Sequence, residues 1–202
     1  MADLLVTNVR PDAGAPADIL IRDGRIEAIG ASLPRPPGIS VEDGGGAIAI
    51  APFVEPHVHL DKILWGLPWH SINVPPSLRA MIDNEVEIRR TLPWSVRERA
   101  GNLMRQCVAM GSTHIRSHVD AQTAWGIGHV EAMLDIRRRY ADLVDLQLVT
   151  FPQGGMLCSP GAVALMEQSL ALGVDAVAVA RPTAKSRSCL SRWAWAISRQ
   201  TF

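Results

Sequence analysis

Residues 53–61 read Phe53-Val54-Glu55-Pro56-His57-Val58-His59-Leu60-Asp61, and they end an apolar run that begins at Ala47. A short apolar run of this kind predicts a buried β-strand. His57 and His59 stand two apart at its end, and alternate side chains of a strand point to the same face. Both imidazoles can therefore reach one ion, and imidazole suits zinc or iron. The alternative is a coincidence of two polar residues at a strand edge.

The chain beyond this motif alternates between strands and helices. Apolar spacing predicts helices near residues 77–90, 95–110, 130–140 and 161–172, with strands at 113–120, 143–151 and from 174 onward. Such alternation with short links indicates parallel strands joined by right-handed crossovers. A complete (β/α)8 barrel needs about 250 residues, and only about 150 are present after the first fifty. The predicted fold class is therefore α/β, with an incomplete TIM-type barrel of about four strands.

The first fifty residues have a different pattern. Residues 17–22 and 25–29 flank Asp23-Gly24, which suits a tight hairpin because glycine tolerates a positive φ. Three prolines and Gly44-Gly45-Gly46 then interrupt the strands. We therefore predict a small N-terminal β layer at residues 1–50, the first part of a (β/α) barrel at 51–180, and an aberrant basic tail at 181–202.

Polar side chains mark the ends of the two later strands. Arg116, His118 and Asp120 share one face of the strand at 113–120, where an apolar helix layer would be a costly neighbour for ionisable groups. They line a polar cavity with a catalytic role, or they form a structural ion-pair network beneath it. Gln153 follows the strand at 143–151, and its amide matches the amide-like edge of a heterocycle. The alternative for Gln153 is a loop residue that caps backbone groups.

Composition excludes several classes of protein. The 202 residues include 20 Lys and Arg against 20 Asp and Glu, so no net charge attracts nucleic acid or an anionic membrane. We find no apolar run that would span a bilayer and no secretion signal at the start. The 3 cysteines are widely spaced, which favours reduced thiols over a disulfide framework. We expect a globular cytoplasmic protein.

Taken together, these features resemble the amidohydrolase superfamily, and within it the cytosine deaminase branch. The resemblance rests on the hairpin at residues 18–30, the motif at 53–62, and two later segments, His114-Ile115-Arg116-Ser117-His118-Val119-Asp120 and Asp145-Leu146-Gln147-Leu148-Val149-Thr150-Phe151-Pro152-Gln153. Their order and spacing fit the family from about residue 3 to about residue 177.

The resemblance implies a role for each candidate residue. His57 and His59 would be the first ligands of one catalytic Fe or Zn ion, and Gln153 would hold a pyrimidine or triazine ring. Pocket-shaping or ligand-orienting roles would fall to Asp61, Arg116, His118 and Asp120. The implied reaction is the hydrolysis of a C–N bond in a cyclic amidine, as in cytosine deamination and pyrimidine metabolism. There a metal-activated water attacks a ring carbon and ammonia leaves. The alternative substrate is an N-alkyl aminotriazine, from which an alkylamine leaves.

The chain also departs from the family. The remaining ligands, a His and an Asp, and the acid/base Glu and second His come from later strands, so we predict no catalytic acid/base here. Gly154 stands where the deaminases carry Glu. After Asp175 only basic charges follow, which favours out-of-frame translation and a truncated, weakly active or inactive enzyme. A partner-binding tail is the alternative. Exposed sheet edges predict self-association, and a non-catalytic interaction module is the third functional possibility.

Overall fold

The computed structural model describes residues 3–71, 73–156 and 159–178. The predicted tail at 181–202 and two of the cysteines, Cys158 and Cys189, lie outside the described residues. The chain divides into two compact units, Met1–Ala51 and Pro52–Phe202. Within the described ranges, every helix is too short or too polar to cross a membrane.

The first unit is a small sheet built mainly by hairpins. Its strands are β1 (Leu4–Pro11), β2 (Ala17–Arg22), β3 (Arg25–Gly30), β4 (Ser40–Asp43) and β5 (Ile48–Ala49). The order is β3-β2-β1-β4, and β5 pairs with a further part of β1. The predicted hairpin is confirmed: Asp23 and Gly24 have φ values of 48° and 72°, as a tight turn between twisted strands requires. Its small core is formed by Leu5, Leu20 and Ile39.

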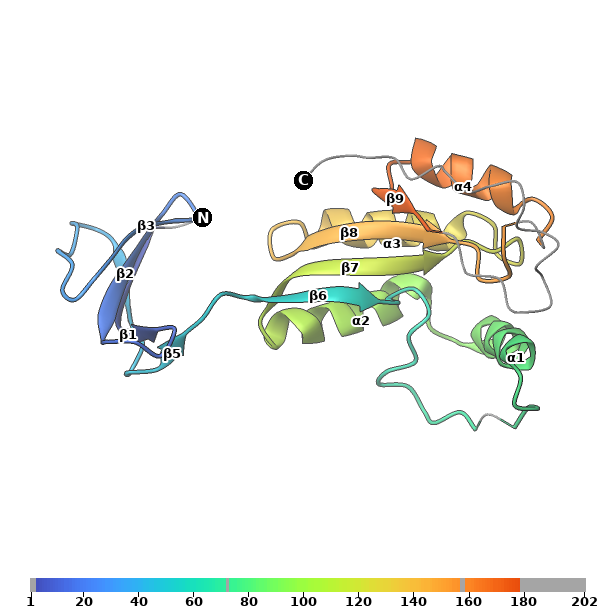
Figure 1. The fold of residues 1–202 in the computed structure, drawn as a ribbon, viewed down its shortest axis with the longest axis horizontal. Helices are drawn as coiled ribbons and strands as arrows, with labels where there is room; N and C mark the ends of the chain where they lie inside the picture. Colours follow the sequence, from blue (N-terminus) through green and yellow to red (C-terminus); the bar gives the residue numbers. More distant parts are fainter. Residues whose placement is uncertain (1–2, 72, 157–158, 179–202) are drawn as a thin grey trace. The chain divides into compact units, whose positions relative to one another are not determined.

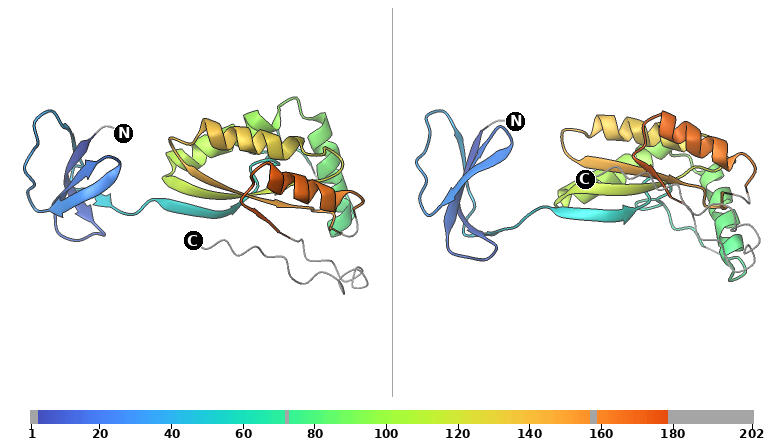
Figure 2. Two further views of the ribbon diagram at one scale, coloured as in Figure 1. Left: turned by 90° about the horizontal axis from the view of Figure 1, so that it is seen from above. Right: turned by 45° about the horizontal axis from the view of Figure 1, so that its top comes forward.

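The second unit is a parallel sheet with helices in its connections (Figure 1). Its strands run in the order β6 (Phe53–Val58), β7 (Ser112–Asp120), β8 (Asp145–Phe151) and β9 (Ala176–Val177). Helix α2 (Val96–Ala109) packs on β7, α3 (Gly128–Arg139) packs on β7 and β8, and α4 (Ala162–Ala171) packs on β8 and β9 (Figure 2). The expected fold class is confirmed as a mixed α/β arrangement with part of a parallel barrel.

Helix α1 (Leu78–Thr91) has a different position. It lies beyond the carboxyl-terminal ends of β6, β7 and β8 rather than alongside the strands (Figure 1). Ser77 starts it by accepting a hydrogen bond from the backbone N–H of Ala80. Because parallel barrels place their active sites at this end of the strands, α1 is positioned to contribute side chains to a site.

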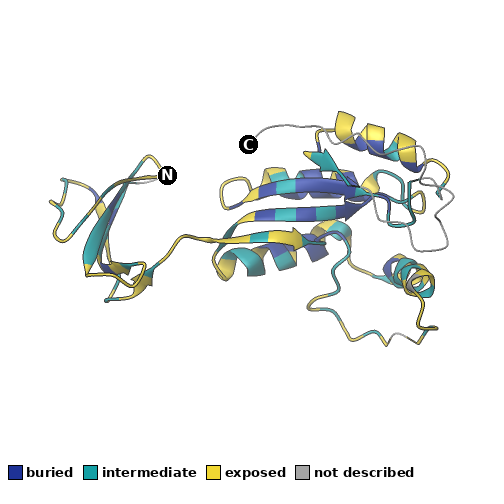
Figure 3. Ribbon diagram, viewed as in Figure 1, coloured by how far each residue is buried: buried dark blue, intermediate teal, exposed yellow. Residues whose placement is uncertain are grey.

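The core of the second unit lies between the central strands and their helices. Buried side chains concentrate on β7 and β8, whereas the beginning of β6 is exposed (Figure 3). Ile115 and Leu148 from these strands pack with Met104 and Met133 from α2 and α3. This core fixes the central strands and therefore fixes the residues at their carboxyl ends.

The structure corrects the prediction of one buried strand in the apolar run that begins at Ala47. The run is not one strand: β5 joins the first sheet, β6 joins the second, and the units divide between Ala51 and Pro52. Phe53 and Val54 are 56% and 64% exposed. An apolar composition shows that a segment can pack, but it does not show which sheet the segment joins or whether it lies at an edge.

Candidate active site

Four predicted site residues lie at the carboxyl ends of neighbouring parallel strands. His57 belongs to the end of β6 and His59 follows it directly, while His118 belongs to the end of β7. Gln153 follows β8 by two residues. Strands β6, β7 and β8 are adjacent in the sheet, so residues separated by up to 96 positions in the sequence reach one edge.

Three imidazoles form a cluster there. The ring centroids of His57 and His59 are 5.3 Å apart, in an edge-on arrangement. His118 stacks on His57 at 3.9 Å with an angle of 17° between the planes. Phe151 closes the cluster with its ring centroid 5.3 Å from that of His59. Both predicted ligands therefore lie together at the ends of the strands, and His118 is a third histidine beside them.

His59 has the hydrogen bond expected of an oriented ligand. Its Nδ1 lies 2.8 Å from the backbone carbonyl oxygen of His118. Because a carbonyl only accepts, Nδ1 carries the proton and the lone pair is on Nε2. Burial lowers the pKa of His59, and the charge of Lys62 adds to this effect. Both features favour a neutral imidazole with Nε2 free to bind a metal ion.

His118 is also held in its neutral form. Burial, followed by the charges of His57, His59 and Arg116, lowers its pKa to about 4. Within the described chain, Nδ1 of His118 is buried and has no hydrogen-bond partner. A buried polar atom of this kind is costly unless it is paired, so His118 offers an unused nitrogen beside the two predicted ligands.

Imidazole nitrogens suit a divalent transition metal, but the described residues supply only some of the ligands that such a metal needs. Among residues 3–71, 73–156 and 159–178, no three His, Cys, Asp or Glu side chains are arranged to hold a metal ion. Catalytic zinc normally has three protein ligands. His57 and His59 therefore fit as two ligands of such a site, and their geometry alone does not complete it.

Asp61 follows β6 and Asp120 ends β7, and both carboxylates are fully buried. Oδ2 of Asp61 accepts a hydrogen bond of 3.0 Å from the backbone N–H of Asp120. Oδ2 of Asp120 accepts 3.2 Å and 2.7 Å hydrogen bonds from Arg89 and Gln122. Burial and then the charge of Asp61 raise the pKa of Asp120, against the opposing charge of Arg89. These contacts match the structural ion-pair alternative for Asp120, and they place Asp61 in the same network.

Aromatic rings link the two ends of this ion-pair network. The Arg89 guanidinium lies 4.1 Å from the centroid of the Trp125 ring, which stacks on His129 at 4.7 Å. Nδ1 of His129 is 3.3 Å from Oδ2 of Asp61. Burial opposes ionisation of Asp61, yet His129 holds the pKa of that carboxyl below its usual value. The network thereby fixes α1, through Arg89, against the ends of the strands.

Gln153 is engaged at both ends of its amide. Its Oε1 accepts a hydrogen bond from Nζ of Lys62, and its Nε2 donates one of 3.1 Å to Oε2 of Glu85. Nζ of Lys62 is also 3.5 Å from Oε1 of Glu85. The predicted ring-binding residue is therefore part of a polar group formed by three different segments of the chain.

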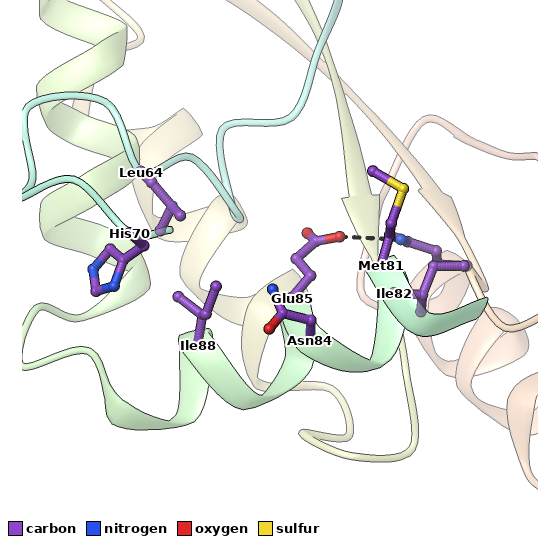
Figure 4. A pocket seen from close by; sticks show the side chains of 8 residues that line it. Leu64, His70, Met81, Ile82, Asn84, Glu85 and Ile88 are labelled. Atoms are coloured by element: carbon purple, nitrogen blue, oxygen red, sulfur yellow. Dashed lines mark hydrogen bonds between the residues drawn. The ribbon is translucent and has the colours of Figure 1, made fainter. Parts of the chain in front are cut away.

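A pocket of about 320 Å³ opens beside this polar group (Figure 4). Apolar side chains form most of its wall, with Glu85 and Gln153 as polar members; it is lined by Leu64, His70, Met81, Ile82, Asn84, Glu85, Ile88 and Gln153. Figure 4 shows Met81, Glu85 and Ile88 projecting from α1. An apolar cavity with a few polar groups is the usual form of a small-molecule site.

Arg116 is less closely associated with the site than predicted. Its Nε donates to Oε1 of Gln147 on β8, and the side chain is only partly buried. The structure also shows contributors that the sequence did not predict: Lys62, Glu85 and Arg89. Lys62 adjoins the histidine motif, which could have pointed to it, but the two α1 residues resemble an ordinary surface ion pair in the sequence.

Comparisons with known proteins fit this arrangement. Residues covering 88% of the chain superpose on N-isopropylammelide isopropylaminohydrolase from Burkholderia multivorans with 41% identity and a TM-score of 0.80. The chain has part of the amidohydrolase-superfamily fold. 5-Methylcytosine deaminase from Klebsiella pneumoniae matches with 30% identity and a TM-score of 0.69 over 86% of the chain. No protein-family model matches.

A curated relative is also named as an amidohydrolase. N-isopropylammelide isopropyl amidohydrolase from Pseudomonas sp. (strain ADP) is 26% identical over 153 residues, which cover 72% of this chain and 37% of the relative. The solved structures are covered to 44% and 42% of their own lengths. The chain thus spans less than half of each of these amidohydrolases, and it corresponds to their N-terminal part.

Proposed function

We propose that this chain provides the first metal ligands and the ring-binding amide of an amidohydrolase that cleaves an exocyclic C–N bond on a nitrogen heterocycle. The observation that carries the proposal is the orientation of His59. Its Nδ1 is engaged by the carbonyl of His118, so Nε2 is the free nitrogen, and His57 lies beside it. This is how a protein prepares an imidazole to bind a metal ion.

The proposed metal is one divalent ion, zinc or iron, held here by His57 and His59. When bound, such an ion supplies Lewis-acid activation of water. We assign two further roles to residues of this chain: the backbone carbonyl of His118 orients His59, and Gln153 binds the ring. The pocket beside Gln153 accommodates a small apolar substituent or the ring itself.

The N-alkyl aminotriazine is the better-supported substrate of the two that the sequence left open. Similarity is higher to the N-isopropylammelide enzyme, 41% against 30% identity and a TM-score of 0.80 against 0.69. The resemblance also places Gly154 where the deaminases usually carry Glu, which weakens the assignment to cytosine. Cytosine remains the second candidate, because the deaminase shares the same fold over 86% of the chain.

The test compares the two rings directly. The full chain, loaded with Zn²⁺ or Fe²⁺, is titrated with N-isopropylammelide and with cytosine, and the release of isopropylamine and ammonia is followed. We expect tighter binding of N-isopropylammelide and low turnover that requires the metal ion. His59→Ala should abolish turnover, whereas His114→Ala, which alters an exposed histidine on β7, should not.

Two results would contradict the proposal. Turnover that survives His59→Ala would remove this histidine from the reaction. A metal-loaded chain that binds neither ring would favour a non-catalytic interaction module instead.

A further inference from the structure

Gln153 is flanked by two side chains of opposite charge. Lys62 contacts the amide oxygen, and Glu85 accepts a 3.1 Å hydrogen bond from the amide nitrogen. A lysine ammonium can only donate hydrogen bonds, and a carboxylate can only accept them. Rotating the amide by 180° would place its oxygen against a carboxylate and its NH2 group against an ammonium. The two flanking charges therefore permit one orientation of the amide.

Both flanking residues are themselves held in place. Nζ of Lys62 lies 5.5 Å from the centroid of the Phe151 ring, and only 13% of the lysine side chain is exposed. Oε1 of Glu85 is 3.5 Å from Nη2 of Arg89, whose side chain is 2% exposed and pairs with Asp120. The orientation of the amide is therefore connected, through Glu85 and Arg89, to the buried ion pair with Asp120.

One donor and one acceptor remain on the amide. Oε1 uses one of its two lone pairs on Lys62, and Nε2 uses one of its two hydrogens on Glu85. A ring edge with an adjacent donor and acceptor can pair with what remains. Which end of that edge meets the acceptor depends on how the amide is turned.

We infer that Lys62 and Glu85 are positioning residues that lock the Gln153 amide in one orientation and thereby fix the order of acceptor and donor offered to the ring. The part of this inference that concerns the ring rests on the proposed function. The orientation of the amide itself belongs to the free chain and can be measured without any ligand.

The first experiment therefore uses the ¹⁵N-labelled full chain alone. The side-chain amide signals of Gln153 are assigned by their loss in Gln153→Leu. We expect Lys62→Met and Glu85→Gln each to shift these signals and to speed their hydrogen exchange. The matched control is Glu87→Gln on the same helix, because Glu87 pairs only with the exposed Arg90 among the described residues. Signals that Lys62→Met and Glu85→Gln leave unchanged would overturn the inference.

The second experiment asks whether the lock acts through Gln153. With Zn²⁺ present, Lys62→Met and Glu85→Gln should each weaken binding of N-isopropylammelide by about tenfold. In a Gln153→Leu background the same substitutions should change the affinity by less than about twofold. Equal losses in both backgrounds would show direct contact with the ligand and would overturn the positioning role.

The two experiments separate the possible failures. If the amide signals respond to Lys62→Met and Glu85→Gln but the chain binds no ring, the orientation is supported and the proposed function fails. If the ring binds but the amide signals do not respond, the proposed function stands and the lock is wrong. Circular dichroism of each variant verifies that the helices remain folded.

Discussion

The two ends of the parallel strands in the second unit differ in which side chains they bury and which they expose. At the carboxyl end, Asp61 and Asp120 are fully buried, while at the amino end of β6 the apolar side chains of Phe53 and Val54 are exposed. Burying charge costs free energy even when the charge is paired. The two buried carboxylates are therefore tolerated only because side chains such as Arg89 and His129 pair with them. The carboxyl ends of the strands therefore hold a buried set of paired charges, whereas the amino end of β6 leaves apolar side chains exposed.

Breaking the buried ion pair should produce the largest effect. Asp120→Asn leaves the Arg89 guanidinium, 2% exposed, without its nearest counter-charge. Removing one partner of a buried pair typically costs about 3–5 kcal/mol of unfolding free energy, because the other charge stays buried. Urea denaturation of the wild type and of Asp120→Asn would measure the difference in unfolding free energy.

A surface pair serves as the control for this prediction. Arg97 and Asp135 also form an ion pair, but both side chains are well exposed. Asp135→Asn should therefore cost no more than about 1 kcal/mol. If Asp120→Asn costs no more than Asp135→Asn, the carboxyl end is not the tightly coupled network described above.

The exposed start of β6 gives the second prediction. We propose that this edge drives self-association, because an unpaired strand with apolar side chains is a template for another chain. Val54→Lys should weaken association about tenfold, as expected from losing the burial of one valine. Sedimentation velocity over a concentration series measures this. Val163→Lys, at an exposed valine on α4, should leave association unchanged; equal effects would mean that the edge is not the contact.

The smallest expected effect is a change in how stability depends on pH, and it comes from the exposed carboxylate of Glu98. Glu98 accepts hydrogen bonds from the hydroxyl and the backbone N–H of Ser95, and these bonds lower its pKa below 4.5. The charged form is favoured in the folded state, so its stabilisation is full above pH 4.5 and is lost as the pH falls through the lower folded-state pKa. Glu98→Gln retains the capping geometry and lacks this titration.

Thermal melts between pH 6 and pH 3 would test this prediction. The wild type should lose more stability than Glu98→Gln as the solution becomes acidic, and the difference should be small. If the wild type instead became more stable than Glu98→Gln as the pH fell, the predicted direction of the effect would be wrong.

Local signals made much of the fold predictable. Pro93 and Gly111 delimit a segment with apolar residues at helical spacing, and α2 forms within it. Asp23-Gly24 predicts its hairpin because the turn needs two positive φ angles. The run from Ala47 wrongly predicts one buried strand, since its division between two sheets depends on strand pairing far along the chain.

The site could be predicted only in part, for a related reason. His57 and His59 are recognisable because their spacing alone puts them on one face. Glu85 and Arg89 are four residues apart on a helix, a pattern that usually marks a solvent-exposed pair. Their contacts with Gln153 and Asp120 join positions 68 and 31 residues away, and no local pattern records such contacts.

Zinc binding by the full chain shows whether His57 and His59 are metal ligands. The full chain is dialysed against Zn²⁺, and bound metal is measured by elemental analysis and by isothermal titration. We expect one zinc ion per chain, lost in both His57→Ala and His59→Ala and retained in His114→Ala. Unchanged zinc content in His57→Ala and His59→Ala would contradict it.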